Sequence, residues 1–586
     1  MLEKVKSLRG ILYKKMVEKQ EPVEELIPGF SVQKPKRIVE FPSTDDLTKI
    51  NIIYPLMEPF SYANIKWDAE NKELMYLVLE PKLTEEEQQL LKKLSEGLIE
   101  LIDVDLSAVN DFSKAITYLQ NNVLKVIKEF GLRPSQQQFI KLMYYIYRDF
   151  IGFNEIEPLL QDPNIEDISC DGVGVTIYVI HRKFGSLKTN IVFKNLDYLR
   201  QYVIKLSERT GRYVSYAEPI LAGTLPDGSR VSATLAGDVA TRGPVFTIRK
   251  FSEKPFSPID QLELKTVDSE ILAYFWYLME HGISLLIIGG VATGKTSLLN
   301  TLCMFIPPEA KIVSIEDTRE LKIPNDHWIP SLARVGFGIP TPTGEKYGEV
   351  TLFDLLKESF RQNPDYVIVG EVRGAEAYVM FQGMSSGHPS ISTFHAGSVD
   401  TLIKRLITAP IELSPTLIES LDVIAVMIHA REKGKSARRM KEVIEVESVN
   451  PKTDEVKTRT IFAWDPITDT YKKVGESIKI EKVTLAKGGD IEYAKKEIER
   501  RKRIIEWLKA KNIRDYIEVT KLINLYYKEP EKLMEMIGEE FEGPVKETPR
   551  IEPQKQRIAV EVPREKKRRR ISLLSLLGLK LLKGNI

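Results

Sequence analysis

Gly289-Gly290-Val291-Ala292-Thr293-Gly294-Lys295-Thr296 matches the pattern G-x-x-x-x-G-K-[ST] at every fixed position. The apolar run 283–288 precedes it, and residues 297–302 have the composition of a helix start. A buried strand, a glycine turn and a helix form the setting in which this motif binds phosphates, because loop N–H groups and the positive helix end point at the anion. Lys295 would reach the β- and γ-phosphates, Thr296 would bind Mg²⁺, and Ser297 completes the predicted site. The sequence therefore predicts a nucleoside triphosphate site.

Acidic residues follow two further apolar runs. Residues 366–369 lead to Glu371, and residues 312–315 lead to Glu316. If both runs are parallel strands, their carboxylates reach the sheet edge at which the phosphate loop lies. We expect Glu371 to act as the general base or to hold Mg²⁺ through a water, with Glu316 assisting. The sequence alone does not rank the two carboxylates.

Two of the six histidines, His388 and His395, flank the short run 390–394. That run is expected to form the strand beside the one that ends at Glu371. Both histidines are therefore predicted to sense the γ-phosphate. The alternative is a purely structural role for either one.

Composition limits the class of protein. The chain has 586 residues, 84 Lys and Arg against 83 Asp and Glu, a net charge of +1 and two cysteines. Near-zero net charge gives no reason to expect direct nucleic-acid binding. Without a C-x-x-C pair the cysteines exclude a four-cysteine zinc site, and their scarcity favours a reducing compartment. Because no run of about 18 apolar residues and no signal peptide is recognisable, we expect a cytoplasmic protein.

The chain divides into five predicted parts. Residues 259–538 alternate helices with apolar strands at 285–288, 311–315, 366–369, 390–394 and 423–428, which predicts an α/β fold: a RecA-like core with a parallel sheet covered on both faces. Residues 151–250 favour a small α+β domain, and the Pro-bearing stretch 251–258 a hinge. Residues 1–150 are predicted to be a mainly helical accessory region with two strands near residues 65–80. Residues 539–586 form a basic tail ending in a short apolar helix, which either associates peripherally with a membrane or partner, or has no specific role.

The motif order resembles that of the type II/type IV secretion ATPase superfamily, and residues 370–374 and 392–397 resemble its archaeal branch. The likeness extends over residues 150–535. It implies ATP hydrolysis by a hexamer, with each nucleotide between the small N-terminal domain and the RecA-like domain. It also implies that Arg212 and Arg230, with Arg249 as a weaker candidate, reach the phosphates; an ordinary interdomain salt bridge is the alternative. The implied partner is a polytopic membrane platform protein at the inner face of the cell membrane.

The resulting hypothesis is an Mg²⁺-dependent ATPase that turns domain rotation about residues 251–258 into assembly of a type IV pilus-like filament or into secretion. Three alternatives remain open. The load could be an archaellum. The RecA-like core could move nucleic acid, although basic and aromatic residues are not interleaved as such binding requires. The chain could also be a nucleotide-gated scaffold that does not turn over ATP.

Overall fold

The computed structural model describes residues 30–33, 41, 46–101, 112–235, 237–251, 254–336, 338, 346–432, 435–450, 452–453 and 455–538. The predicted basic tail with its apolar helix lies outside the described residues. The predicted hinge is described except for residues 252 and 253. None of the described helices combines the length and apolar character that crossing a membrane requires.

The N-terminal half is built on a sheet of nine strands. In spatial order these are β1 (Asn51–Met57), β2 (Ser61–Asp68), β3 (Glu73–Leu79), β6 (Gly185–Val192), β5 (Thr176–His181), β4 (Ile165–Cys170), β9 (Val245–Arg249), β8 (Arg230–Thr234) and β7 (Ile220–Thr224). Neighbouring strands are antiparallel except β3 and β6. The predicted hairpin near residues 65–80 is confirmed as β2 and β3. Alternating burial along β3 shows that one face of the sheet packs on the core.

Helices pack against this sheet. The longer ones are α2 (Glu85–Leu101), α3 (Phe112–Glu129), α4 (Gln136–Phe150) and α6 (Leu196–Arg209), and the short ones are η2 (Leu47–Lys49), η4 (Asn154–Ile156) and α5 (Glu157–Gln161). Thr84 and Glu87 form a capping box at the start of α2, since each side chain accepts the N–H of the other residue at 3.3 and 3.0 Å.

The boundary expected at residue 150 falls inside a single core. β3 pairs with β6 at Tyr76 and Thr189, and one hydrophobic cluster extends from Phe30 to Ile248. Parts assigned to an accessory region and to a small α+β domain therefore share one sheet and one core among the described residues. The prediction missed this because the β3–β6 pairing joins segments that are far apart in the sequence.

The C-terminal half contains the predicted α/β core. Its sheet has the order β12 (Trp328–Leu332), β11 (Ile312–Glu316), β13 (Tyr366–Val372), β14 (Ser390–Phe394), β10 (Leu285–Gly289), β15 (Val423–Glu432), β16 (Lys435–Val449), β17 (Val456–Asp465) and β18 (Thr470–Lys473). Neighbours from β12 to β15 are parallel, and those from β15 to β18 are antiparallel. All residues of β10, β11 and β14 are buried, which explains the continuous apolar run of β10 and the small polar residues among the apolar positions of β14. The RecA-like parallel core is confirmed.

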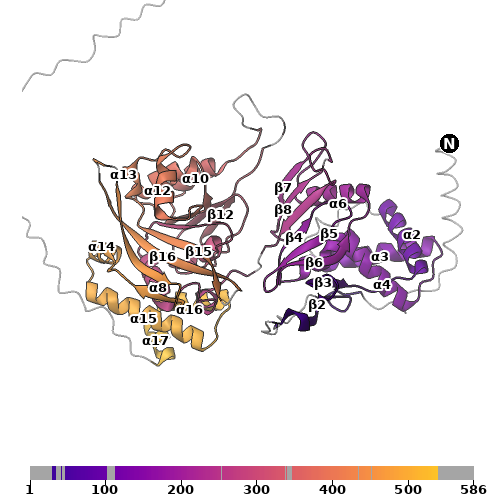
Figure 1. Cartoon of the computed structure of the whole chain (residues 1–586), viewed down its shortest axis with the longest axis horizontal. Coiled ribbons are helices and arrows are strands. Elements are labelled where there is room, and N and C mark those ends of the chain that lie inside the picture. Colours follow the sequence, from indigo (N-terminus) through magenta and orange to yellow (C-terminus); the bar gives the residue numbers. More distant parts are fainter. Residues whose placement is uncertain are drawn as a thin grey trace, which may run out of the picture. The chain divides into compact units, whose positions relative to one another are not determined.

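Helices cover both faces of this sheet. They are α7 (Pro258–Glu263), α8 (Ser269–Glu280), α9 (Lys295–Cys303), α10 (Leu352–Arg361), α11 (Glu376–Ser385), α12 (Val399–Ile407), α13 (Pro415–Ile418), α14 (Ile478–Ala486), α15 (Ile491–Ala510), α16 (Tyr516–Lys528) and α17 (Pro530–Ile537). Figure 1 shows α10 and α12 on one side of the strands and α8 and α15 on the other. Because the central strands are parallel, their carboxyl ends meet at one edge of the sheet, and this edge positions the site.

Candidate active site

The phosphate loop joins β10 to α9, and its backbone is tightly constrained. A Cβ at Gly289 would lie 2.5 Å from the Met427 carbonyl oxygen and 2.6 Å from Thr293 Oγ1, so only glycine fits. Ala292 and Gly294 have φ angles of 58° and 89°, in the left-handed region. In the part of the chain that the structure describes, no side chain caps α9 at Gly294. The first N–H groups of this helix are thus left for an anion, as the sequence predicts.

Lys295 is folded back on the loop. Its Nζ donates hydrogen bonds to the carbonyl oxygens of Gly289 at 3.1 Å and Gly290 at 2.7 Å. Burial lowers the pKa of Lys295. Gly289 and Gly290 therefore act through their backbone. Phosphate oxygens would offer the lysine a charged partner that the carbonyls cannot supply.

A cavity of about 460 Å³ lies over the loop. Among the predicted site residues, its lining includes Val291, Ala292, Thr293, Gly294, Lys295, Thr296, Ser297, Glu316, Glu371, His395, Arg230 and Arg249. The loop, both acidic strand ends and one histidine thus meet because β10, β11, β13 and β14 are parallel and end at the same edge.

Glu316 ends β11 and is only 3% exposed. Its Oε1 accepts the backbone N–H groups of Glu320 at 2.8 Å and Leu321 at 2.9 Å, whereas Oε2 is buried without a hydrogen-bond partner in the described chain. Burial raises the pKa of Glu316 to about 7. A Cβ at Gly370 would lie 3.1 Å from Glu316 Cγ, so a glycine there makes room for this carboxyl group. Glu316 can therefore exchange a proton near neutral pH.

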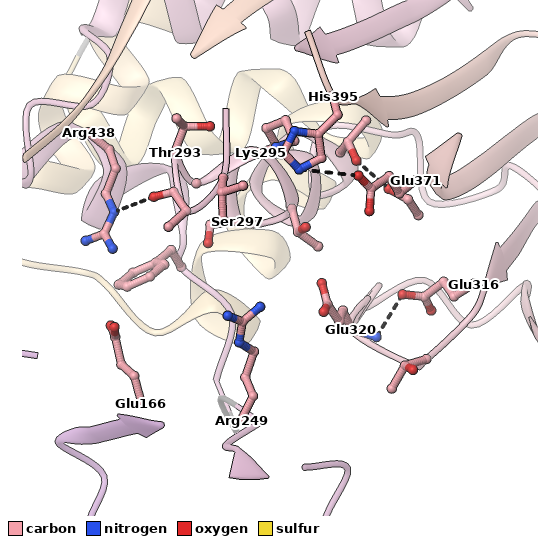
Figure 2. Close-up of a pocket in the computed structure, with 18 of the residues that line it drawn as sticks. Glu166, Arg249, Thr293, Lys295, Ser297, Glu316, Glu320, Glu371, His395 and Arg438 are labelled. Atoms are coloured by element: carbon pink, nitrogen blue, oxygen red, sulfur yellow. Dashed lines mark hydrogen bonds and ion pairs between the residues drawn. The ribbon is translucent and has the colours of Figure 1, made fainter. Parts of the chain in front are cut away.

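Glu371 lies beside cations. Its Oε2 forms an ion pair with Arg373, and its Oε1 lies 3.8 Å from His395 Nε2 (Figure 2). Burial, followed by the nearby Lys295 cation, lowers the pKa of His395. His395 is consequently mostly neutral at neutral pH and can donate or accept a hydrogen bond.

The N-terminal sheet contributes arginines to the same cavity. Arg230 Nη2 lies 2.9 Å from Glu320 Oε1, and Arg249 Nε lies 3.2 Å from Asp167 Oδ1. Arg212 instead lines a second cavity of about 620 Å³, and its guanidinium donates to the carbonyl oxygen of Ala222. The expected ranking is thus corrected: Arg230 and Arg249 reach the phosphate-loop cavity, and Arg212 does not line it.

His388 is not part of the cavity lining. It precedes β14 and makes an edge contact with Phe360, with ring centroids 5.2 Å apart, whereas His395 follows the strand. Five extended residues span roughly 16 Å, so the two histidines lie at opposite edges of the sheet. The prediction that both histidines reach the γ-phosphate is thus corrected: His395 lines the cavity, and His388 does not.

Several cavity residues escaped the sequence analysis. Arg373 and Glu320 lie within four residues of the predicted acids, and this proximity was the available signal. Glu166 and Arg438 come from strands of the two different sheets. No motif marks them, because only strand pairing brings them to the loop.

A sequence model of the family described as "Type II/IV secretion system protein" matches residues 154–542. The chain belongs to this family. The resemblance inferred from the motif order is thus confirmed, and archaeal relatives fit the expected branch.

"Uncharacterized protein MJ0900" of Methanocaldococcus jannaschii is 36% identical over 523 residues, which are 86% of this chain and 92% of that protein. "Type IV secretion system protein PtlH" of Bordetella pertussis is 30% identical over 315 residues, 48% of this chain and 91% of PtlH. The solved VirB11 ATPase from the Brucella suis type IV secretion system is 22% identical, covering 49% of this chain and 91% of its own, with a TM-score of 0.25.

Proposed function

We propose that this member of the type II/IV secretion system family is a motor ATPase. In this proposal it hydrolyses ATP with Mg²⁺ as a hexamer, and domain rotation about residues 251–258 drives secretion or the assembly of a pilus-like filament through a membrane platform protein. One observation carries the proposal: a single cavity joins the phosphate loop to Glu316, Glu371, His395 and Arg230.

The residues present fit a nucleotide and its metal. Glu316 Oε2 and Glu371 Oε1 are buried oxygens that accept no hydrogen bond within the described residues. The Thr296 side chain belongs to the cavity lining. Thr296 would hold Mg²⁺ directly and Glu371 through a water, and the metal would supply charge neutralisation on the phosphates.

The geometry favours Glu316 as the general base over Glu371, the residue first expected in that role. Each carboxylate keeps one buried oxygen that accepts no hydrogen bond from the described residues, but Glu371 is paired with Arg373, whereas burial raises the pKa of Glu316 to about 7. A general base whose pKa lies near the working pH is partly deprotonated, and it still binds a proton strongly enough to remove one from water. In this assignment Glu316 takes the proton of the attacking water, and Glu371 holds Mg²⁺ through a second water.

Lys295 and Arg230 would stabilise the charge that develops on the γ-phosphoryl group. Both are held by exchangeable partners: loop carbonyls for Lys295, and Glu320 for Arg230. Such preorganised cations lower the barrier only if they reach the phosphate oxygens. Movement of the N-terminal sheet toward the loop would deliver Arg230, which links chemistry to domain rotation.

The test is steady-state ATP hydrolysis over a range of protein concentrations for the wild type, Glu316→Gln and Glu371→Gln. We expect cooperative dependence on concentration, loss of turnover with retained ATP binding in Glu316→Gln, and weakened metal dependence in Glu371→Gln. Glu358→Gln, an exposed change on α10, is the matched control. Normal turnover by Glu316→Gln would reject its assignment as base.

Two further outcomes would favour a different function for the protein. Absence of hydrolysis by the wild type, even with lipid present, would favour the nucleotide-gated scaffold. Strong stimulation by DNA would favour the nucleic-acid translocase.

A further inference from the structure

Arg438 differs from the other arginines that line the cavity. The other three each pair with a carboxylate: Arg230 with Glu320, Arg249 with Asp167, and Arg373 with Glu371. Among the described residues, Arg438 forms no ion pair, and its recorded hydrogen bond is from Nε to the Ala292 carbonyl oxygen at 3.3 Å. The two Nη groups of a guanidinium carry four N–H donors. The cavity thus contains one arginine whose outer donors have no protein acceptor in the described chain.

The side chain of Arg438 lies against the phosphate loop. It extends from β16, where its backbone pairs with His429 of β15. Its Cγ is 3.7 Å from the position that a Cβ on Gly294 would take, and its Nε bonds to Ala292. It therefore touches both left-handed residues of the loop. In Figure 2, Arg438 and Glu371 lie on opposite sides of Lys295.

The neighbouring residue anchors this part of β16. Arg439 is 1% exposed, and it donates to both oxygens of Asp469, at 2.7 and 2.9 Å, and to the Leu264 carbonyl oxygen at 3.0 Å. The next backbone N–H, of Met440, donates to the Thr266 carbonyl oxygen at 2.9 Å. A buried bidentate pair fixes geometry as well as contributing energy. The backbone that carries Arg438 is therefore held in place relative to the cavity wall.

We propose that Arg438 binds the diphosphate portion common to ATP and ADP and positions the phosphate loop for it. This inference rests on the proposed nucleotide site. A planar guanidinium matches phosphate oxygens. Because Arg438 lies away from Glu371, on the other side of Lys295, it acts on phosphates that remain after hydrolysis. An interaction made equally with the ground state and the transition state lowers KM and leaves kcat unchanged.

The experiment measures binding of fluorescently labelled ADP and ATPase kinetics for Arg438→Gln and Arg438→Lys. Arg361→Gln, an exposed arginine change on α10, is the matched control, and the Tm of every variant is recorded. For Arg438→Gln we expect the Kd for ADP and the KM for ATP to rise about tenfold, the effect of losing a charge-assisted hydrogen bond, while kcat stays within about twofold. Arg438→Lys should recover part of the affinity, and Arg361→Gln should behave as the wild type.

An unchanged Kd for ADP in Arg438→Gln would overturn the inference. A fall in kcat at constant KM would also overturn it, because Arg438 would then act on the transition state alone. ADP binding does not require turnover. If the wild type binds ADP but does not hydrolyse ATP, the proposed function fails, whereas loss of ADP affinity in Arg438→Gln would still support the role of Arg438.

Discussion

Removing the charge of Glu316 should change how the stability of the nucleotide-free protein depends on pH. Burial raises the pKa of this carboxyl group from 4.5 to about 7 in the folded chain. The folded state therefore binds the proton more tightly than the unfolded state does. The stability gained from this is complete below the unfolded pKa, and it is lost as the pH rises through the folded pKa.

The magnitude follows from the two pKa values. Each pKa unit corresponds to about 1.4 kcal/mol, so the difference between 4.5 and about 7 amounts to about 3 kcal/mol of folding free energy. Glu316→Gln resembles the protonated carboxyl group, since its amide oxygen can still accept the N–H groups of Glu320 and Leu321. The variant should match the wild type at about pH 4 and be more stable at about pH 8. A gain of that size corresponds to a Tm difference of about 6 °C in a large domain.

The assay is thermal unfolding of the nucleotide-free wild type and Glu316→Gln at several pH values, followed by circular dichroism. Glu358→Gln, the same change at an exposed carboxylate of α10, is the matched control. A Tm difference between wild type and Glu316→Gln that stays constant from about pH 4 to about pH 8 would contradict this prediction, because the carboxyl group would then titrate alike in both states.

Three further predictions concern activity and folding. The kcat/KM for ATP should rise with pH through about pH 7 as Glu316 loses its proton, and a flat profile measured over that range would contradict its role as base. Gly289→Ala should abolish binding of labelled ADP, since the new Cβ would lie 2.5 Å from a carbonyl oxygen; retained affinity would show that the loop can shift. Asp162→Ala should destabilise the N-terminal sheet by about 3 kcal/mol, because the buried hydroxyls of Tyr54 and Tyr76 lose the acceptor that they reach at 2.6 and 2.7 Å. Urea unfolding measures this loss of stability, and a change below about 1 kcal/mol would contradict the prediction.

The core strands and their polar ends could be predicted because local pattern determines them. β10 is fully buried and appears as an unbroken apolar run. β11 and β14 are also fully buried, although polar residues interrupt their apolar positions. Once the strands are taken as parallel, Glu316, Glu371 and His395 must meet at one edge. That argument needs no knowledge of distant contacts, and the structure brings these residues together as it requires.

Other features depend on contacts that no local pattern contains. β1 and β12 contain Pro55 and Pro330, which argue against a strand, yet both strands lie at the edge of a sheet, where a missing N–H is tolerated. Arg438 reaches the loop through the register of the β15–β16 hairpin, which shifts between Val426 and Met427. Shifts of this kind change which side chains face a given site, and the sequence does not reveal where they occur.

The charges of the cavity also show how the N-terminal sheet and Glu316, the proposed general base, are joined. Glu320 contacts both: its carboxylate pairs with Arg230 of β8, and its backbone N–H donates to Glu316. The same short segment therefore holds an arginine from one sheet and the buried carboxyl group of the other. A phosphate that draws Arg230 away from Glu320 removes the cation that fixes this segment. Because the Glu320 N–H favours the charged form of Glu316, any movement of the segment alters the proton affinity of Glu316. In the proposed mechanism, movement of the N-terminal sheet and the proton affinity of Glu316 are thus connected through Glu320.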